Sequence, residues 1–275
     1  MKNTHIVSIE DGVVRVDKYM ADLFPEYSRA AITKLFDLNL IKLDGKPIQP
    51  GHKLRPGTEF EYDLGPLQAK PEVIDLPIIY EDDNVIVVDK PAGVISHARG
   101  QFWQEASVAS FIRNKISGMD GERGGIVHRL DRATSGVMIC AKNVSTLKFL
   151  QKQFNERNVK KTYVACTKNT PKDNKAHIVA PVARNLKDPK KFHIDPHGKP
   201  AETYYEVIKV GSTGAQIKLT PTTGRTHQLR LHLAYIKCPI LGDELYGDMS
   251  APRMMLHANS LEIMINEGTK RTFTS

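Results

Sequence analysis

The stretch "HRLDRATSGVMICAKN", residues 128–143, sets a single carboxylate among arginines directly ahead of an apolar run. Asp131 lies between Arg129 and Arg132, and a Thr-Ser-Gly turn separates it from "VMICA". The run "GGIV" precedes the stretch, so two segments rich in β-branched residues enclose the polar one and predict two strands. A charged loop held between strands is either a structural ion pair or an active site.

The strand pattern continues along most of the chain. Apolar runs predict strands in "NVIVVDKP" (84–91), "GGIVHRL" (124–130), "GVMICAKN" (136–143), "KKTYVACTK" (160–168), "TYYEVIKV" (203–210) and "AQIKLTP" (215–221). Helical spacing of apolar residues predicts helices in "NVSTLKFLQKQFNER" (143–157) and "TGRTHQLRLHLAYI" (223–236). Because strands outnumber helices and do not alternate regularly with them, we predict an α+β domain around a central mixed or antiparallel sheet.

The first 65 residues predict a separate module. "RVDKYMADLF" (15–24) is amphipathic, and a second helix begins at the N-cap candidate Ser28. An Asp-Gly pair at residues 44–45 predicts a hairpin, and "GTEFEYDL" (57–64) alternates like a strand. A proline-containing stretch without periodicity follows. We therefore expect a module over residues 1–65, a linker over 66–77 and a larger domain over 78–275.

Composition restricts the class of protein. The chain has 275 residues, of which 40% are hydrophobic and 25% charged, which is typical of a globular protein. No apolar run approaches the roughly 20 residues that a membrane helix needs, and the first residues lack the apolar middle of a signal peptide. We expect a cytoplasmic protein with no membrane partner. Three widely spaced cysteines argue against a disulfide framework.

Positive charge is concentrated in one region. The net charge is +8, but residues 1–70 hold ten Lys and Arg against ten Asp and Glu. Residues 142–199 hold fourteen against four, an excess of ten positive charges. Such a region attracts polyanions through counterion release, although a solvated surface without a partner would look the same in sequence. The charge distribution favours nucleic acid as the partner.

Two familiar chemistries do not fit the motifs. "HRLD" resembles the kinase catalytic loop, but the residue order differs, and the chain has neither a Gly-x-Gly-x-x-Gly loop nor an Asp-Phe-Gly motif. His227 and His232 lie five residues apart without the glutamate of a zinc-protease helix. These histidines therefore give little support for a metal site.

Several long motifs, in a fixed order, resemble those of the RluA-type pseudouridine synthases. These are "YEDDNVIVVDKPAGVISH", "HRLDRATSGVMICAKN", "KKTYVA", "PTTGRTHQLRLHLAYIKCPILGDELYG" and "RMMLHANSLEI", which together span about residues 78–262. Residues 15–63 resemble the small S4-like RNA-binding module that often precedes this catalytic domain. The resemblance implies a pseudouridine synthase fold and an isomerase that converts uridine in RNA to pseudouridine, without metal or cofactor.

The resemblance also implies roles for particular residues. The catalytic aspartate of the family falls on Asp131, which acts as nucleophile or base toward the ribose. Tyr163 stacks on the uracil and is placed to take a proton, while Arg225 pairs with the aspartate. A guanidinium lowers the pKa of a desolvated carboxyl and fits it with two hydrogen bonds. We expect RNA contacts from Arg129, which can fill the gap left by the extruded base, and from Arg132, Arg230, Arg29 and Lys34.

Three functions remain open at this point. We expect the substrate to be large-subunit 23S ribosomal RNA, because the first module resembles that of the ribosomal-RNA branch of the family, and tRNA is the alternative substrate. We also expect the protein to be a monomer. A non-catalytic RNA-binding or ribosome-assembly protein would need no carboxylate facing phosphates. A hydrolase using Asp131 would release free uracil rather than isomerise it.

Overall fold

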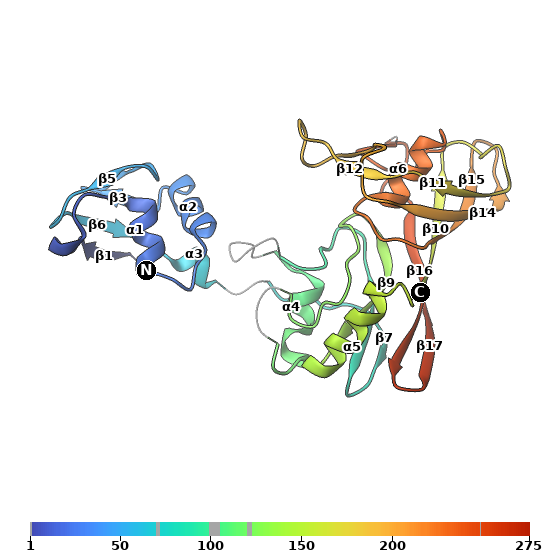
Figure 1. Ribbon diagram of the computed structural model, residues 1–275, viewed down its shortest axis with the longest axis horizontal. Helices are drawn as coiled ribbons and strands as arrows, with labels where there is room; N and C mark the ends of the chain where they lie inside the picture. The colour runs from blue at the N-terminus through green and yellow to red at the C-terminus, as the bar shows by residue number, and fades with distance from the viewer. Residues whose placement is uncertain (1, 70–71, 99–104, 120–122, 248) are drawn as a thin grey trace. The chain divides into compact units, whose positions relative to one another are not determined.

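A nine-stranded sheet and a small separate module make up the protein (Figure 1). The computed structural model describes all residues except 1, 70–71, 99–104, 120–122 and 248. The chain divides into two compact units, Met1–Glu72 with Ala98–Glu105, and Val73–His97 with Ala106–Ser275. No helix among the described residues is long and apolar enough to cross a membrane.

The first unit combines short helices with a four-stranded sheet of order β1-β6-β3-β4. Its elements are β1 (Asn3–Ile6), η1 (Ile9–Asp11), β2 (Val14–Arg15), α1 (Val16–Leu23), α2 (Arg29–Asp37), β3 (Ile41–Leu43), β4 (Lys46–Pro47), β5 (Lys53–Leu54), β6 (Glu59–Tyr62) and α3 (Gly65–Gln68). The predicted Ser28 cap is confirmed, since its side chain accepts a hydrogen bond from the Ala31 N–H. Asp44 and Gly45 both have positive φ, as the tight β3–β4 hairpin requires.

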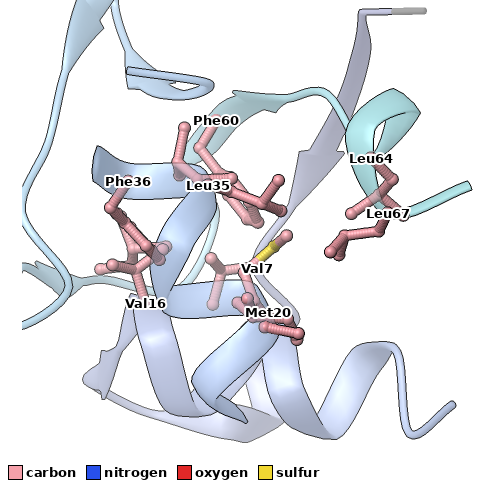
Figure 2. Packing of buried hydrophobic residues seen from close by; sticks show 12 residues of the cluster. Val7, Val16, Met20, Leu35, Phe36, Phe60, Leu64 and Leu67 are labelled. Carbon is pink, nitrogen blue, oxygen red and sulfur yellow. The ribbon is translucent and has the colours of Figure 1, made fainter. Parts of the chain in front are cut away.

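The apolar faces of α1 and α2 meet in the core of this unit, as their spacing predicted (Figure 2). Met20, Leu35 and Phe60 are fully or almost fully buried there. The core also takes in Leu64 and Leu67, which flank or belong to α3. The first unit therefore continues into the stretch 66–68, which the sequence pattern assigned to the linker.

The second unit is built on the mixed sheet, of order β11-β14-β15-β10-β16-β9-β8-β7, with β17 beside β16. Its strands are β7 (Ile78–Glu81), β8 (Val85–Lys90), β9 (Ser135–Ala141), β10 (Lys160–Thr167), β11 (Lys175–Val179), β12 (Val182–Arg184), β13 (Phe192–Ile194), β14 (Glu202–Val210), β15 (Ala215–Pro221), β16 (Leu256–Asn266) and β17 (Thr269–Thr274). Its helices are α4 (Val108–Ile112), η2 (Arg113–Lys115), α5 (Val144–Asn155) and α6 (Gln228–Tyr235). The predicted α+β class is confirmed.

One long strand joins the two halves of the sheet. β16 pairs antiparallel with β10 and β17 but parallel with β9, through His257 opposite Ser135 and Ala258 opposite Gly136. Gly136 has φ of +115°, and a Cβ atom there would lie 2.3 Å from the Ala258 carbonyl oxygen. Only glycine allows this approach. β9, which follows the Asp131 loop, is thereby placed one strand away from β10, with β16 between them.

Helices cover the sheet where its residues are most apolar. α5 packs on β9 and β16 through Leu150 and its neighbours, while α4 covers the other apolar cluster of β8 and β9. α6 packs its leucines, including Leu229 and Leu233, against the cluster that contains β10 and β15. The polar segments between these layers therefore converge near the first residues of β10.

The predicted strand over residues 124–130 is wrong. Ile126 makes a single isolated bridge to Cys140, and the stretch is otherwise irregular. Gly125 has φ of +74°, and a Cβ atom there would lie 2.5 Å from the Ala141 carbonyl oxygen. The positive φ takes the backbone out of the extended region, so Asp131 follows an irregular segment rather than a strand.

Candidate active site

A cavity of about 450 Å³ in the second unit gathers the polar segments that the sheet brings together. Its walls come from residues 127–131, from 221–230, and from the end of α5 and the start of β10, including Tyr163. Among the described residues that line it, Asp131 is the one carboxylate, whereas several arginines and a lysine face the same space. The cavity therefore combines one acid with a basic lining.

The loop that carries Asp131 is fixed by hydrogen bonds to residues 90–96. Ser96 Oγ accepts a hydrogen bond from the Leu130 N–H at 3.0 Å and donates one to the Leu130 carbonyl at 2.9 Å. The Thr134 N–H donates to the Asp131 carbonyl, which closes a turn. Leu130 is buried in the apolar cluster beneath the loop. The backbone on both sides of Asp131 is thus held without using its carboxylate.

Two basic side chains of the α6 region face the Asp131 carboxylate. Arg230 Nη1 lies 3.7 Å and His227 Nε2 lies 3.9 Å from Asp131 Oδ2. The Asp131 side chain is 20% exposed, so it remains open to the cavity. Burial lowers the pKa of His227, although Asp131 opposes the shift, so Arg230 is the permanent positive charge at this position.

Arg230 is held in place by a second carboxylate behind it. Its Nε and Nη2 donate to the two oxygens of Asp243 at 2.8 and 2.6 Å, and its guanidinium lies over the Tyr246 ring. Tyr246 in turn shares a 2.8 Å hydrogen bond with His227 Nδ1. The bidentate pair fixes the plane of the guanidinium, so that its remaining nitrogen is presented to Asp131.

Tyr163 reaches the cavity from β10. The register between β10 and β16 shifts between Thr162 and Tyr163, and such an irregularity changes the direction of a side chain. Burial and, secondarily, the Asp131 charge raise the pKa of the Tyr163 phenol above its ordinary value. The phenol therefore stays protonated at neutral pH, beside the carboxylate.

Sequence comparison identifies the larger domain. The model for RNA pseudouridylate synthases matches residues 84–235, and the S4 domain model matches residues 14–60. The chain belongs to the RNA pseudouridylate synthase family. It is 34% identical to a protein of Borreliella burgdorferi named ribosomal large subunit pseudouridine synthase D, over 98% of this chain and 87% of that protein.

Other relatives agree with this assignment. An RNA pseudouridine synthase of Aquifex aeolicus, described as uncharacterized, is 38% identical over 90% of this chain and 82% of its own length. The solved structure of human RNA Pseudouridylate Synthase Domain Containing 1 aligns with a TM-score of 0.62 at 26% identity, over 76% of this chain and 86% of that one. The protein is thus a pseudouridine synthase with an RNA-binding S4 domain.

The structure corrects the expected contact of Arg225 in this synthase. Arg225 lines the cavity, but its Nε donates to the Pro200 carbonyl at 3.0 Å, and it forms no ion pair with Asp131 among the residues that the structure describes. The reason lies at the start of α6. Gln228 Oε1 accepts from the Arg225 N–H, and Gln228 Nε2 donates to the Glu202 carbonyl, so residue 225 is held beside β14.

Arg230 is likewise not the surface RNA contact that its sequence position suggested, since only 7% of its side chain is exposed. The facing position on Asp131 belongs to Arg230 instead of Arg225. A signal was present in the sequence: Arg230 lies within "QLRLHL", a helix apolar on most sides, and an arginine there requires a buried partner, which "GDELYG" supplies as Asp243.

The other expected RNA contacts lie in three places. Arg129 is exposed and lines the cavity. Arg132 is exposed beside it, and its Nη1 donates to the Gly93 carbonyl at 3.3 Å. In the first unit Lys34 is exposed on α2, and Arg29 forms a 2.6 Å ion pair with the buried Asp17. Arg29 keeps 55% of its side chain exposed.

Lys90 supports the Asp131 loop from below. Its side chain is fully buried, and its Nζ donates to the carbonyl oxygens of Pro91, Val94 and Arg132 at 2.9, 2.8 and 3.3 Å. Because Arg132 follows Asp131 directly, this ammonium joins the end of β8 to the Asp131 loop. Burial lowers the pKa of Lys90 to about 8.

Replacing Lys90 by methionine should destabilise the protein by roughly 1–3 kcal/mol at neutral pH, because buried carbonyls lose their donor. The difference should also change with pH. Between about 8 and the ordinary value of 10.5, the folded protein has released a proton that the unfolded chain still holds. The wild-type free energy of unfolding should therefore rise relative to Lys90→Met across this window, as denaturant titrations would show. A constant difference would contradict the lowered pKa.

Proposed function

We propose that this pseudouridine synthase isomerises specific uridines of large-subunit 23S ribosomal RNA, with Asp131 as the nucleophile or base toward the ribose. The observation that carries the proposal is the cavity in which one carboxylate faces a fixed guanidinium beside a protonated phenol. The ribosomal substrate rests on the relative from Borreliella burgdorferi, whose name states this activity. A monomer is the active form that we propose.

The residues around Asp131 suit the bond changes of this isomerisation. The bond between ribose C1′ and uracil N1 breaks, the ring turns, and C1′ joins C5 instead; C5 then loses its proton and N1 gains one. No atom is added or removed, and no oxidant is needed. Asp131 acts at the ribose, and the Arg230 guanidinium, with Nη1 3.7 Å from Asp131 Oδ2, faces its carboxylate. Tyr163 offers a ring face for the uracil, while its phenol stays protonated, so the Asp131 carboxylate is the base in the cavity for the proton that leaves C5.

A uridine must leave its stack to enter this cavity. Extrusion costs a few kcal/mol of stacking and pairing free energy. Tyr163 restores part of the stacking, and the exposed Arg129 at the cavity is placed to fill the gap in the RNA.

The test is to map pseudouridine by chemical labelling in cells with and without this gene. The proposal expects one or a few positions of 23S ribosomal RNA to lose the modification and to regain it when the gene is restored. Loss confined to tRNA would replace the substrate and keep the chemistry. Unchanged pseudouridine in all RNA, together with an inactive purified protein, would contradict the enzymatic proposal.

Basic residues beyond the cavity should supply most of the nonspecific attraction for RNA. The loop between β12 and β13 projects from the second unit and, with the residues after it, carries four exposed lysines: Lys187, Lys190, Lys191 and Lys199 (Figure 1). Replacing all four by glutamine should weaken binding across RNA sequences. It should also flatten the dependence of log affinity on log salt, by about 0.7 for each phosphate of single-stranded RNA that the protein no longer neutralises. Turnover at saturating RNA should stay nearly unchanged. An unaltered salt slope would show that these lysines do not meet RNA.

A further inference from the structure

Two neighbouring cations in the cavity have no partner within the part of the chain that the structure describes. Lys161 on β10 and Arg157, just after α5, both line the cavity, and the side chain of neither forms a hydrogen bond or ion pair with a described residue. Arg225 and Arg230 differ in this respect, because a carbonyl and a carboxylate already hold them. The exposed Arg129 forms no such bond with a described residue either, and the proposed function already assigns it to the gap left by the extruded base. The first two are therefore cations without a structural task.

Lys161 is partly removed from water without a counterion. It is half-buried, and its Nζ lies 3.7 Å from the position that a Cβ atom would take on Gly224, in the opposite wall. The nearby His128 adds no charge, because burial and Lys161 itself lower the pKa of that imidazole to about 3. Burial and Arg157 lower the pKa of Lys161. Arg157 is exposed to water, so the unfavourable charge is that of the half-buried Lys161 ammonium, which an anion bound by both side chains would offset.

Arg157 has a backbone conformation that is unusual for its residue type. It has φ of +61° directly after the α5 C-cap residue Glu156, at a position where helices usually place glycine or asparagine. The conformation directs the chain from α5 into β10, and the arginine side chain lines the cavity. A guanidinium fork and an ammonium point charge are together the usual protein ligands of a phosphate group.

The negative charge of Asp131 disfavours binding of a phosphate next to it in the cavity. Asp131 and its partners Arg230 and His227 form one cluster, and Asp131 repels another anion. Lys161 and Arg157 have no such acid beside them among the described lining residues. We propose that Lys161 and Arg157 bind a phosphodiester group adjoining the target uridine, which holds the ribose in register with Asp131. This inference rests on the proposed function and assigns the part of the substrate that these two residues contact.

The test pairs a protein variant with single-phosphate changes in the RNA. Lys161→Met and the control Lys160→Met are compared on a short RNA that contains the mapped uridine; Lys160 is the exposed neighbour on the same strand, facing the other side. Each phosphate near the uridine is replaced in turn by an uncharged methylphosphonate. Lys161→Met should lower kcat/KM by about 10- to 100-fold, as expected for a charged hydrogen bond, and Lys161→Arg should restore most of it.

One methylphosphonate position should reduce wild-type kcat/KM by a similar factor but leave Lys161→Met almost unaffected, because both changes remove the same contact. The proposal would be overturned if Lys161→Met lost as much kcat/KM as the wild type at every methylphosphonate position. It would also be overturned if Lys161→Met and Lys160→Met were equally active. The thermal midpoint of Lys161→Met should be unchanged or higher, whereas a purely structural lysine would lower it. If the wild-type protein turns over no RNA, the proposed function fails. Binding affinities for the same RNA series would then decide the phosphate contact separately.

Discussion

Asp131→Asn is expected to lose isomerisation by at least about four orders of magnitude while keeping its fold and its affinity for RNA. An amide neither attacks C1′ nor accepts a proton, yet it has the size of the carboxylate. The loop should keep its shape, because Ser96 and Thr134 bind the backbone around Asp131 rather than its side chain. Formation of pseudouridine in purified RNA, followed by chemical labelling, measures the effect.

The exposed Asp83, between β7 and β8, provides the matched control, since Asp83→Asn removes the same charge away from the cavity. That variant should retain full activity. Turnover by pure Asp131→Asn above about a thousandth of the wild-type rate would remove Asp131 from the chemistry. An equal loss of activity and of RNA binding would instead indicate a damaged loop.

Arg230→Lys is expected to be severely impaired although the positive charge is kept. A lysine cannot bond both oxygens of Asp243 and also approach Asp131, as the guanidinium does from its three nitrogens. We expect kcat to fall by about 100- to 1,000-fold, which is typical when a fixed electrostatic interaction is removed from an active site. The decrease in kcat for Arg225→Lys should be at least about tenfold smaller than for Arg230→Lys, because Arg225 Nε donates to the Pro200 carbonyl rather than to a carboxylate.

Stability must be measured beside activity for Arg230, since Asp243 is 1% exposed and breaking a buried pair can cost about 3–5 kcal/mol. Activity is therefore assayed well below the variant's thermal midpoint. Greater impairment in Arg225→Lys than in Arg230→Lys would restore the assignment that the sequence alone suggested.

The elements of this fold were predictable where their patterns are local. The spacing of apolar residues predicted α1, α2 and α5, and β-branched runs predicted β8, β9, β10, β14 and β15, because each pattern matches the period of its own element. Residues 124–130 have the same composition but form only one isolated bridge, and Gly125 has φ of +74°, outside the extended region that a strand needs. Neighbouring strands decide this, and they are not visible in the segment itself.

The sequence predicted which residues line the candidate site better than it predicted which of their side chains contact one another. Asp131 and Tyr163 line one cavity, as the motifs suggested. Which arginine faces Asp131 depends on Gln228, whose amide fixes the turn before α6, and on Asp243, which lies beyond that helix. Lys161 was not predicted as a site residue. It stands out only because no described residue pairs with its side chain, and a sequence does not show which side chains lack a partner.

The position of β16 has a consequence for the order in which the protein becomes active during synthesis. This late segment lies between β9, which follows the Asp131 loop, and β10, which bears Tyr163. A nascent chain that lacks it has no strand to align the two, however complete its earlier segments are, and contacts so distant in sequence form slowly. The small first unit contains its own core and has no such dependence. A ribosome-bound chain stalled before residue 256 should therefore present a protease-resistant RNA-binding module attached to a catalytic half that is still open to cleavage.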